Sequence, residues 1–298
     1  MISTAMRGSA EQAWVAEMKM TDIDFLIIGA TKSATTWLQK SLQADPNVFM
    51  PGPELHFFSR EYHRGEDWYL SRFSEATDGQ LIGEKSNSYL EDAQAAARIS
   101  RSLPHAKLVV QLRNPIDRAY SDYCMLYRRG EVGRDIDRYL DPEKPQTARF
   151  IGAGEYYHHL QIYFELFPAE QILVTLYETI KTEPERQLET VRTFIGLEPD
   201  KSASFMRPKV KDKTTPMLNP RMRRVLRPVK PLVAPMRGNN LFQKVHGALA
   251  SEMRYEPLPA HLRDALIEYY KSDVEALSRM LGRDLSGWLR SPTMGFSA

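Results

Sequence analysis

Three short apolar segments recur along the first two thirds of the chain, at residues 24–29, 107–112 and 171–176. None of them shows the strict alternation of polar and apolar residues that marks a half-exposed strand. Nearly continuous apolar runs of this length are typical of strands buried on both faces of a sheet. We therefore expect three central strands in these segments.

Helical spacing of apolar residues fills the stretches between and after these strands. It predicts helices at residues 35–44, 115–129, 154–167 and from about 258 onward. Asp45-Pro46 ends the first helix, and Pro115 suits the first turn of the second. In the last helix the expected core-facing stripe consists of Leu262, Leu266, Tyr269, Tyr270, Val274 and Leu277.

Strands that alternate with helices predict a three-layer α/β fold, with a central parallel sheet and helices on both of its faces. We expect one domain at residues 22–290, preceded by an N-terminal extension at residues 1–21. Six prolines between residues 208 and 236 break the rhythm, so we interpret about 201–246 as an irregular flap.

Composition narrows the class of protein. The 298 residues are 42% hydrophobic and include 12 Phe, 14 Tyr and 4 Trp, which excludes a mainly disordered chain. Cys124 is the single cysteine, which excludes a disulfide scaffold. No apolar run is long enough to span a membrane, and Glu11 and Glu17 interrupt any secretory signal. We expect a soluble, cytoplasmic protein.

The net charge of +2 hides a local excess of positive charge. Residues 201–246 contain 12 Lys or Arg and one Asp. Three interpretations stay open: the segment recognises an anionic acceptor, rests on an anionic membrane, or covers a bound cofactor as a flap. No groove-reading motif accompanies the charge, so we expect no nucleic-acid partner. Nothing in the pattern points to an oligomeric state.

The segment Gly29-Ala-Thr-Lys-Ser-Ala-Thr-Thr36 lies between a predicted buried strand and a helix start. A helix N-terminus presents backbone N–H groups and a positive dipole end to an anion, and Lys32 adds a full charge. The order of residues differs from that of the Walker A loop, in which the lysine comes directly before the hydroxyl residue that holds magnesium. The segment therefore predicts an anion site without the signature of an ordinary ATPase or kinase.

A second anion site is predicted after the strand at residues 107–112. Arg113 follows the carboxyl end of this strand, where ligands bind in parallel sheets. Ser121 lies eight residues further along the next helix, and an arginine fork and a hydroxyl can share one phosphate. Two such sites on one sheet indicate a ligand with phosphates at both ends.

Several segments in this order resemble the sulfotransferases that use 3′-phosphoadenylyl sulfate (PAPS), in particular the heparan sulfate N- and 3-O-sulfotransferase branch and its bacterial relatives. The resemblance spans about residues 22–290. Its motifs are Phe25-Leu-Ile-Ile-Gly-Ala-Thr-Lys-Ser-Ala-Thr-Thr36, Pro53-Glu-Leu-His-Phe-Phe58, Gly83-Glu-Lys-Ser-Asn-Ser-Tyr89 and Leu112-Arg-Asn-Pro-Ile-Asp-Arg-Ala-Tyr-Ser121.

This resemblance implies a P-loop NTPase-like sulfotransferase fold, PAPS as co-substrate with PAP as product, and no metal. It implies that Arg113 and Ser121 hold the 3′-phosphate and that Lys85 approaches the sulfuryl group or the acceptor. Lys32 would also stabilise the leaving oxygen. The implied cofactor-binding residues of the first loop are Lys32, Ser33, Ala34, Thr35, Thr36 and Trp37.

Glu54 is the general base that the resemblance implies, and His56 is its rival. If the segment is extended, both side chains point the same way and can act together. The sequence departs from the family's motifs at three positions. Pro53 stands where the family has lysine, Ala34 where it usually has glycine, and Asn87 where it usually has Pro or Thr. The acceptor is expected to be a carbohydrate, lipid or specialised-metabolite hydroxyl. A kinase-like P-loop protein and a non-catalytic PAP-binding module remain the alternatives.

Overall fold

The structure is a computed structural model that describes residues 18–198, 217–218, 250–251 and 255–290. Its chain divides into two compact units. The first comprises Met1–Asn114 and Tyr156–Pro208, and the second Pro115–Glu155 and Lys209–Ala298. Each unit is described by itself.

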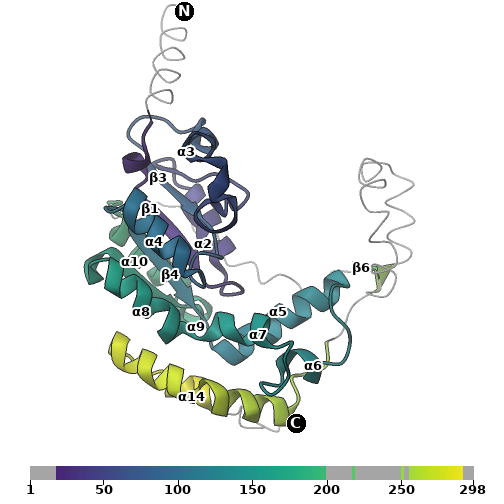
Figure 1. Cartoon of the computed structure of the whole chain (residues 1–298). Helices are drawn as coiled ribbons and strands as arrows, with labels where there is room; N and C mark the ends of the chain where they lie inside the picture. The colour runs from purple at the N-terminus through teal and green to yellow at the C-terminus, as the bar shows by residue number, and fades with distance from the viewer. Residues whose placement is uncertain (1–17, 199–216, 219–249, 252–254, 291–298) are drawn as a thin grey trace, which may run out of the picture. The chain divides into compact units, whose positions relative to one another are not determined.

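A five-stranded parallel sheet forms the centre of the first unit, with the strand order β2-β3-β1-β4-β5 (Figure 1). The three predicted strands are present as β1, β4 and β5, and the sequence pattern did not predict β2 and β3. The strand bounds are β1 Phe25–Gly29, β2 Val48–Phe49, β3 Leu81–Lys85, β4 Lys107–Leu112 and β5 Ile172–Leu176.

Helices cover both faces of this sheet, as the three-layer prediction requires. On one face α2, α9 and α10 enclose a core that includes Phe25, Ile27 and Val109. Leu26 and Leu108 alternate with these residues along the strands and are fully buried, so they face the other side of the sheet. Helices α4 and α8 lie on that side (Figure 1). The helix bounds are α2 Thr35–Gln43, α4 Ala93–Ser102, α8 Tyr156–Leu166, α9 Tyr177–Thr182 and α10 Pro184–Ile195.

Between β2 and β3 the chain folds into short turns around an aromatic cluster. Phe57 stacks on Tyr69 with ring centroids 4.5 Å apart, and Phe58 meets Tyr89 edge-on at 5.6 Å. These four rings are fully buried, so their packing holds in place the turn that starts at Phe57. The elements are the π-helical turn η2 Phe57–Glu61, the 3₁₀ turns η3 Tyr62–Arg64 and η4 Ser71–Phe73, and α3 Glu66–Leu70. Two further 3₁₀ turns, η1 Met20–Asp22 and η6 Ala169–Gln171, precede β1 and β5.

Helices make up most of the described part of the second unit. Tyr270 on the long C-terminal helix donates its hydroxyl to the carbonyl of Ile151 at 2.6 Å. The elements are α5 Pro115–Arg129, α6 Asp137–Leu140, α7 Ala148–Ile151, η5 Gly152–Gly154, α14 Ala260–Leu281 and η8 Ser286–Leu289, with the antiparallel pair β6 Met217–Leu218 and β7 Ala250–Ser251.

The stripe predicted on α14 is wrong at one position, Tyr269. Leu262, Leu266, Tyr270, Val274 and Leu277 are buried, whereas Tyr269 is 37% exposed. Adjacent helical residues differ by about 100° in direction, so Tyr269 lies at the edge of the stripe while Tyr270 lies near its centre. Its hydroxyl instead donates to the Glu155 carboxylate.

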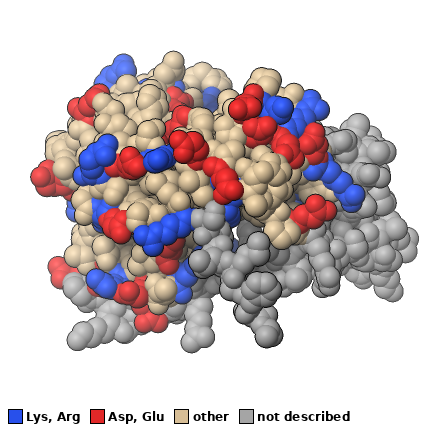
Figure 2. All heavy atoms as spheres, turned by 90° about the horizontal axis from the view of Figure 1, so that it is seen from below, with Lys and Arg blue, Asp and Glu red and all other residues tan. Residues whose placement is uncertain are grey.

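The predicted flap at 201–246 lies outside the described residues except for Met217 and Leu218. Lys and Arg are interspersed with Asp and Glu on the described surface that Figure 2 shows. In the part of the chain that the structure describes, no helix is long and apolar enough to cross a membrane.

Candidate active site

The carboxyl ends of β1, β3 and β4 meet at one edge of the sheet, because all three strands are parallel. The chain leaves this edge through the loop after Gly29, through Ser86-Asn87-Ser88 after β3, and through Arg113 after β4. The residues singled out in the first unit gather here for this reason.

The loop after β1 turns through left-handed backbone at Lys32 (φ 71°) and Ala34 (φ 65°). Ala34 is the residue before α2, where the family usually has glycine, so its methyl group occupies a position that favours glycine. Left-handed residues in a loop that opens a helix turn backbone N–H groups into a concavity suited to anions. The local backbone is thus that of an anion-binding loop.

Ser33 is fully buried between these two residues. Its carbonyl accepts from the Gln111 side chain on β4, but its hydroxyl has no hydrogen-bond partner among the described residues. A buried hydroxyl without a partner costs free energy that a ligand oxygen can recover. The unpartnered Ser33 hydroxyl therefore makes the loop suitable for the oxygens of a phosphosulfate group.

Of the first residues of α2, Thr35 is buried and Thr36 is exposed. Thr35 donates its hydroxyl to the side-chain oxygen of Asn87 at 2.8 Å. The Trp37 side chain belongs to the hydrophobic core, and its backbone N–H donates to the carbonyl of Ala34 at 2.9 Å. Trp37 thus anchors the loop from below.

Glu54 lies at the same edge, in the segment after β2. Gln39 and Gln43 on α2 donate to the carbonyls of Pro51 and Met50, at 3.0 and 2.8 Å, and so fix the chain just before it. Because these amides come from the helix that follows the first loop, α2 positions both parts of the site.

Three groups surround the Glu54 carboxylate. The ammonium group of Lys85, on a side chain only 2% exposed, donates to Oε1 at 2.7 Å. The backbone N–H of Asn87 donates to Oε2 at 3.0 Å, and its side-chain amide donates to Oε1 at 3.2 Å. The His56 Nε2 atom lies 3.8 Å from Oε2. Lys85 is thus the cation beside Glu54, although Pro53 stands at the position of the family lysine.

These contacts keep Glu54 ionised. Partial burial acts to raise the pKa of Glu54, but the hydrogen bond and charge of Lys85, the Asn87 amide and His56 outweigh it, and the pKa is lowered. Burial also lowers the pKa of His56, against the attraction of Glu54. At neutral pH the carboxylate can therefore accept a proton.

His56 takes a left-handed conformation (φ 52°) at the start of η2, so the segment is not the extended strand considered above. The two side chains still face each other, because the backbone N–H of His56 donates to Ser86 Oγ at 2.8 Å and its Nδ1 contacts Ser88 Oγ at 2.7 Å. The Nε2 atom is left on the side of Glu54.

Arg113 lies beside the first loop. Its guanidinium donates to the carbonyl of Lys32 at 3.1 Å and stacks over the Tyr177 ring at 4.6 Å. Ser121 lies half-buried on α5, in the second unit. A shared phosphate between Arg113 and Ser121 therefore stays a prediction.

Two residues that the structure brings into this region were not predicted from the sequence to have a role there. Asn87 joins Thr35 to Glu54, and the buried Glu84 accepts from Ser86 at 2.7 Å and Tyr89 at 2.5 Å. The departure from Pro or Thr at Asn87 was the signal available in the sequence. Among the described residues, no group of three His, Cys, Asp or Glu side chains could hold a metal ion.

The fold and this edge of the sheet define an α/β protein in which a glutamate held by Lys85 and Asn87 lies beside the loop that opens α2. Residues 22–219 match the family described as "Sulfotransferase domain", and the chain belongs to this family.

Curated relatives agree with this assignment. The chain is 33% identical over 195 residues to the bifunctional heparan sulfate N-deacetylase/N-sulfotransferase 1 of Caenorhabditis briggsae. This match covers 58% of this chain and 22% of the relative. It is 34% identical over 180 residues to the human heparan sulfate glucosamine 3-O-sulfotransferase 3B1, covering 58% and 45%. The chain thus spans less than half the length of these relatives.

A solved structure shares the fold. The sulfotransferase from Alicyclobacillus acidocaldarius superposes with a TM-score of 0.66 at 24% identity, over 90% of this chain and 99% of that one. The sulfotransferase fold predicted from the sequence is confirmed.

Proposed function

We propose that the protein transfers the sulfuryl group of PAPS to a hydroxyl of a carbohydrate, lipid or other small-molecule acceptor. The observation that carries this proposal is the Glu54 carboxylate, held ionised by Lys85 and Asn87 next to the loop after β1. A base fixed beside an anion-binding loop suits transfer of an anionic group to a hydroxyl.

The donor's two ends would be held by two separate sets of residues. Lys32, Thr35 and Thr36 would bind the 5′-phosphosulfate. One of its oxygens would accept a hydrogen bond from the Ser33 hydroxyl, which has no partner among the described residues. Arg113 would bind the 3′-phosphate, which distinguishes PAPS from ATP, and the resemblance implies Ser121 as a further residue for this phosphate. PAPS supplies the sulfuryl group and leaves as PAP.

Glu54 takes the proton of the acceptor hydroxyl as the acceptor oxygen bonds to sulfur and the bond from sulfur to the phosphate oxygen breaks. Its low pKa makes it a weak base, so it removes the proton only as the forming bond makes the hydroxyl acidic. Lys85 lies 2.7 Å from the carboxylate and neutralises negative charge where the sulfuryl group passes.

Donor binding is tested by calorimetry with PAP, ATP and ADP in the absence of magnesium. We expect micromolar affinity for PAP, which Arg113→Ala lowers by about 10-fold or more because a charge-assisted phosphate contact is lost. Arg101→Ala, an exposed arginine at the end of α4, is the matched control and should bind PAP like the wild type. Preference for ATP over PAP would overturn the proposal in favour of a kinase-like protein.

The base is tested by two variants, of which Glu54→Gln keeps the size of the side chain. Glu54→Gln should lower PAP release from PAPS by about 10²–10⁴-fold with PAP affinity unchanged, because the proton acceptor is lost. His56→Asn should lower it less, since Nδ1 contacts Ser88 and only Nε2 faces Glu54. The reverse order would make His56 the base, and no loss in either variant would exclude both as the base. Absence of PAP release in the wild type, with PAP still bound, would leave a PAP-binding module without turnover.

A further inference from the structure

Gln111 is a buried amide in a strand that is otherwise apolar after its first residue. The strand β4 reads Lys107-Leu-Val-Val-Gln-Leu112, and Gln111 is fully buried within it. An amide in such surroundings costs free energy unless its hydrogen bonds are made. Gln111 lies near the carboxyl end of β4, beside the loop after β1, and its hydrogen bonds reach that loop.

Gln111 holds this loop at two points. Its backbone carbonyl accepts from the Ala30 N–H at 2.9 Å, and its side-chain Nε2 donates to the carbonyl of Ser33. Within the loop, the Ser33 N–H donates to the Ala30 carbonyl at 3.3 Å. Both ends of the segment 30–33 are therefore attached to one residue of β4.

A second buried amide sets the orientation of the first. Gln187 lies on α10 and is only 4% exposed, and its Nε2 donates to Oε1 of Gln111 at 3.2 Å. The oxygen and nitrogen ends of an amide differ in that only the nitrogen donates. The bond from Gln187 therefore turns the nitrogen of Gln111, and not its oxygen, toward the Ser33 carbonyl. A continuous run of buried hydrogen bonds connects α10 with the loop.

The bond to Ser33 decides where the next N–H group points. In a trans peptide unit the C=O and N–H bonds point in opposite directions. Because the Ser33 carbonyl faces Gln111 on β4, the Ala34 N–H points away from β4, at the residue directly before α2. An N–H group at the start of a helix is a donor suited to an anion.

We propose that Gln111 and Gln187 are positioning residues for the donor, which hold the peptide between Ser33 and Ala34 so that the Ala34 N–H binds the 5′-phosphosulfate of PAPS. This inference rests on the proposed function and deepens it. The two amides touch neither donor nor acceptor. They act on the end of the donor that lies on the loop, and not on the 3′-phosphate.

Two ligands separate the ends of the donor. PAP has a 5′-phosphate and a 3′-phosphate, whereas adenosine 3′-monophosphate lacks the 5′-phosphate that would lie on the loop. The dissociation constants of both are measured on the full chain without magnesium, by calorimetry for PAP and by ligand-detected NMR for the monophosphate. Gln111→Met keeps the length of the side chain and removes its amide. It should weaken PAP binding about 10-fold and that of the monophosphate less than about twofold, because a bond to a charged group is lost only at the 5′ end.

A double variant separates positioning from stability. Gln111→Met alone leaves the Gln187 amide buried without its acceptor, so the urea midpoint should fall. Adding Gln187→Met removes this amide as well, and the midpoint should recover in part while PAP affinity stays about 10-fold low. Recovery of PAP affinity together with the midpoint would assign the loss to stability and overturn the inference.

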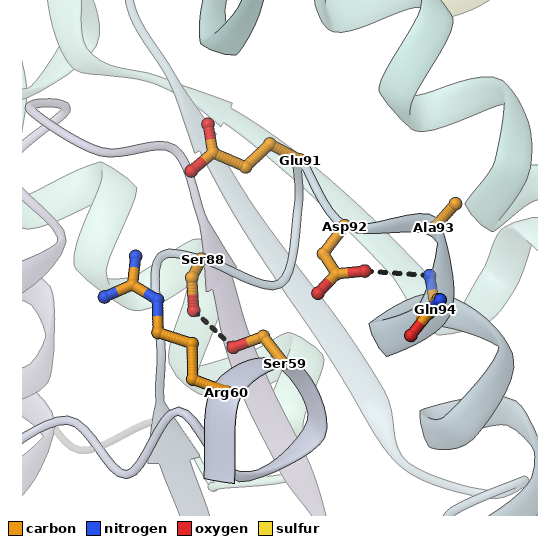
Figure 3. Close-up of a pocket in the computed structure, with 7 residues that line it drawn as sticks. All are labelled: Ser59, Arg60, Ser88, Glu91, Asp92, Ala93 and Gln94. Carbon is orange, nitrogen blue, oxygen red and sulfur yellow. Dashed lines mark hydrogen bonds between the residues drawn. The ribbon is translucent and has the colours of Figure 1, made fainter. Parts of the chain in front are cut away.

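Two controls remove a hydroxyl group without touching the loop, and both should bind the two ligands like the wild type. Thr175→Val acts beside Gln111 in the sheet, where Thr175 donates to the Val110 carbonyl at 3.3 Å. Ser59→Ala acts in the pocket beside η2, where the hydroxyl oxygens of Ser59 and Ser88 lie 2.7 Å apart (Figure 3).

Unchanged PAP affinity in Gln111→Met overturns the inference, and so does equal weakening of both ligands, because a general loss of packing lowers both. If the wild type does not bind PAP, the proposed function fails first. If the wild type binds PAP and the variants bind it equally well, only the role of the two amides fails.

Discussion

Asn87 connects the two halves of the site through a single side chain. Its amide oxygen accepts from Thr35 at the start of α2, and its amide nitrogen donates to Glu54. Its backbone N–H binds the second carboxylate oxygen. Any shift of the loop after β1 is thereby transmitted to Glu54, so their relative geometry is kept at an edge built from loops.

Asn87→Ala should reduce PAP release from PAPS about 10-fold, because Glu54 and Thr35 each lose a partner while the backbone contact remains. PAP affinity should change much less than the rate. Gln171→Ala is the control: this amide binds the carbonyls of Pro104 and Ala106, before β4. A rate unchanged in Asn87→Ala but a lowered unfolding midpoint would show a purely structural role.

Single residues also show where sequence reasoning reached its limit within the site. Lys32 and Arg113 stand out as cations after predicted strands, and the resemblance adds Glu54, His56 and Lys85. The structure places all five in one unit at one edge. The hydrogen bonds that orient them depend on side-chain directions, which no spacing rule gives. Asn87 was visible only as a departure from a motif.

At the scale of elements, β3 shows why part of the sheet was not predicted. Its sequence, Leu81-Ile-Gly-Glu-Lys85, ends in two charged residues and lacks an apolar run. Both charges are nevertheless buried, because Tyr89 and Ser86 bind Glu84 and the distant Glu54 binds Lys85. Their partners belong to tertiary structure, whereas β1, β4 and β5 carry their own apolar signal.

Gly83 in β3 is fixed by the neighbouring strand. It pairs with Phe25, and a Cβ atom at Gly83 would lie 2.4 Å from Phe25 Cζ. Gly83→Ala should therefore lower the free energy of unfolding by about 2–3 kcal/mol, measured by urea denaturation. Phe25→Leu in the same chain should recover part of this loss. Additive costs in the double variant would contradict the proposed clash.

At the scale of the whole molecule, the buried Glu84 makes stability depend on pH. Burial raises its pKa to about 7, although the bonds from Tyr89 and Ser86 act in the opposite direction. The folded chain then binds this proton more tightly than the unfolded chain, whose glutamate has its ordinary pKa of 4.5. The stability that Glu84 contributes is complete below about pH 4.5 and is lost as pH rises to about 7, by about 3 kcal/mol.

Glu84→Gln removes this titration. The variant and the wild type should have similar urea midpoints at pH 5, and the variant should be more stable at pH 8, because it has no carboxylate to ionise in the core. The difference between the two curves isolates Glu84 from His56, whose lowered pKa acts in the opposite direction. Parallel curves from pH 5 to pH 8 would contradict the assignment.

The order of strands in the sheet has a consequence for how the chain is made. The central strand β1 is synthesised first, but its neighbours β3 and β4 begin at Leu81 and Lys107. The loop after Gly29 gains Asn87, Gln111 and Arg113 as contacts only when those residues have left the ribosome. The part of the site that the chain encodes earliest is thus organised late, after pairings across long stretches of sequence have closed.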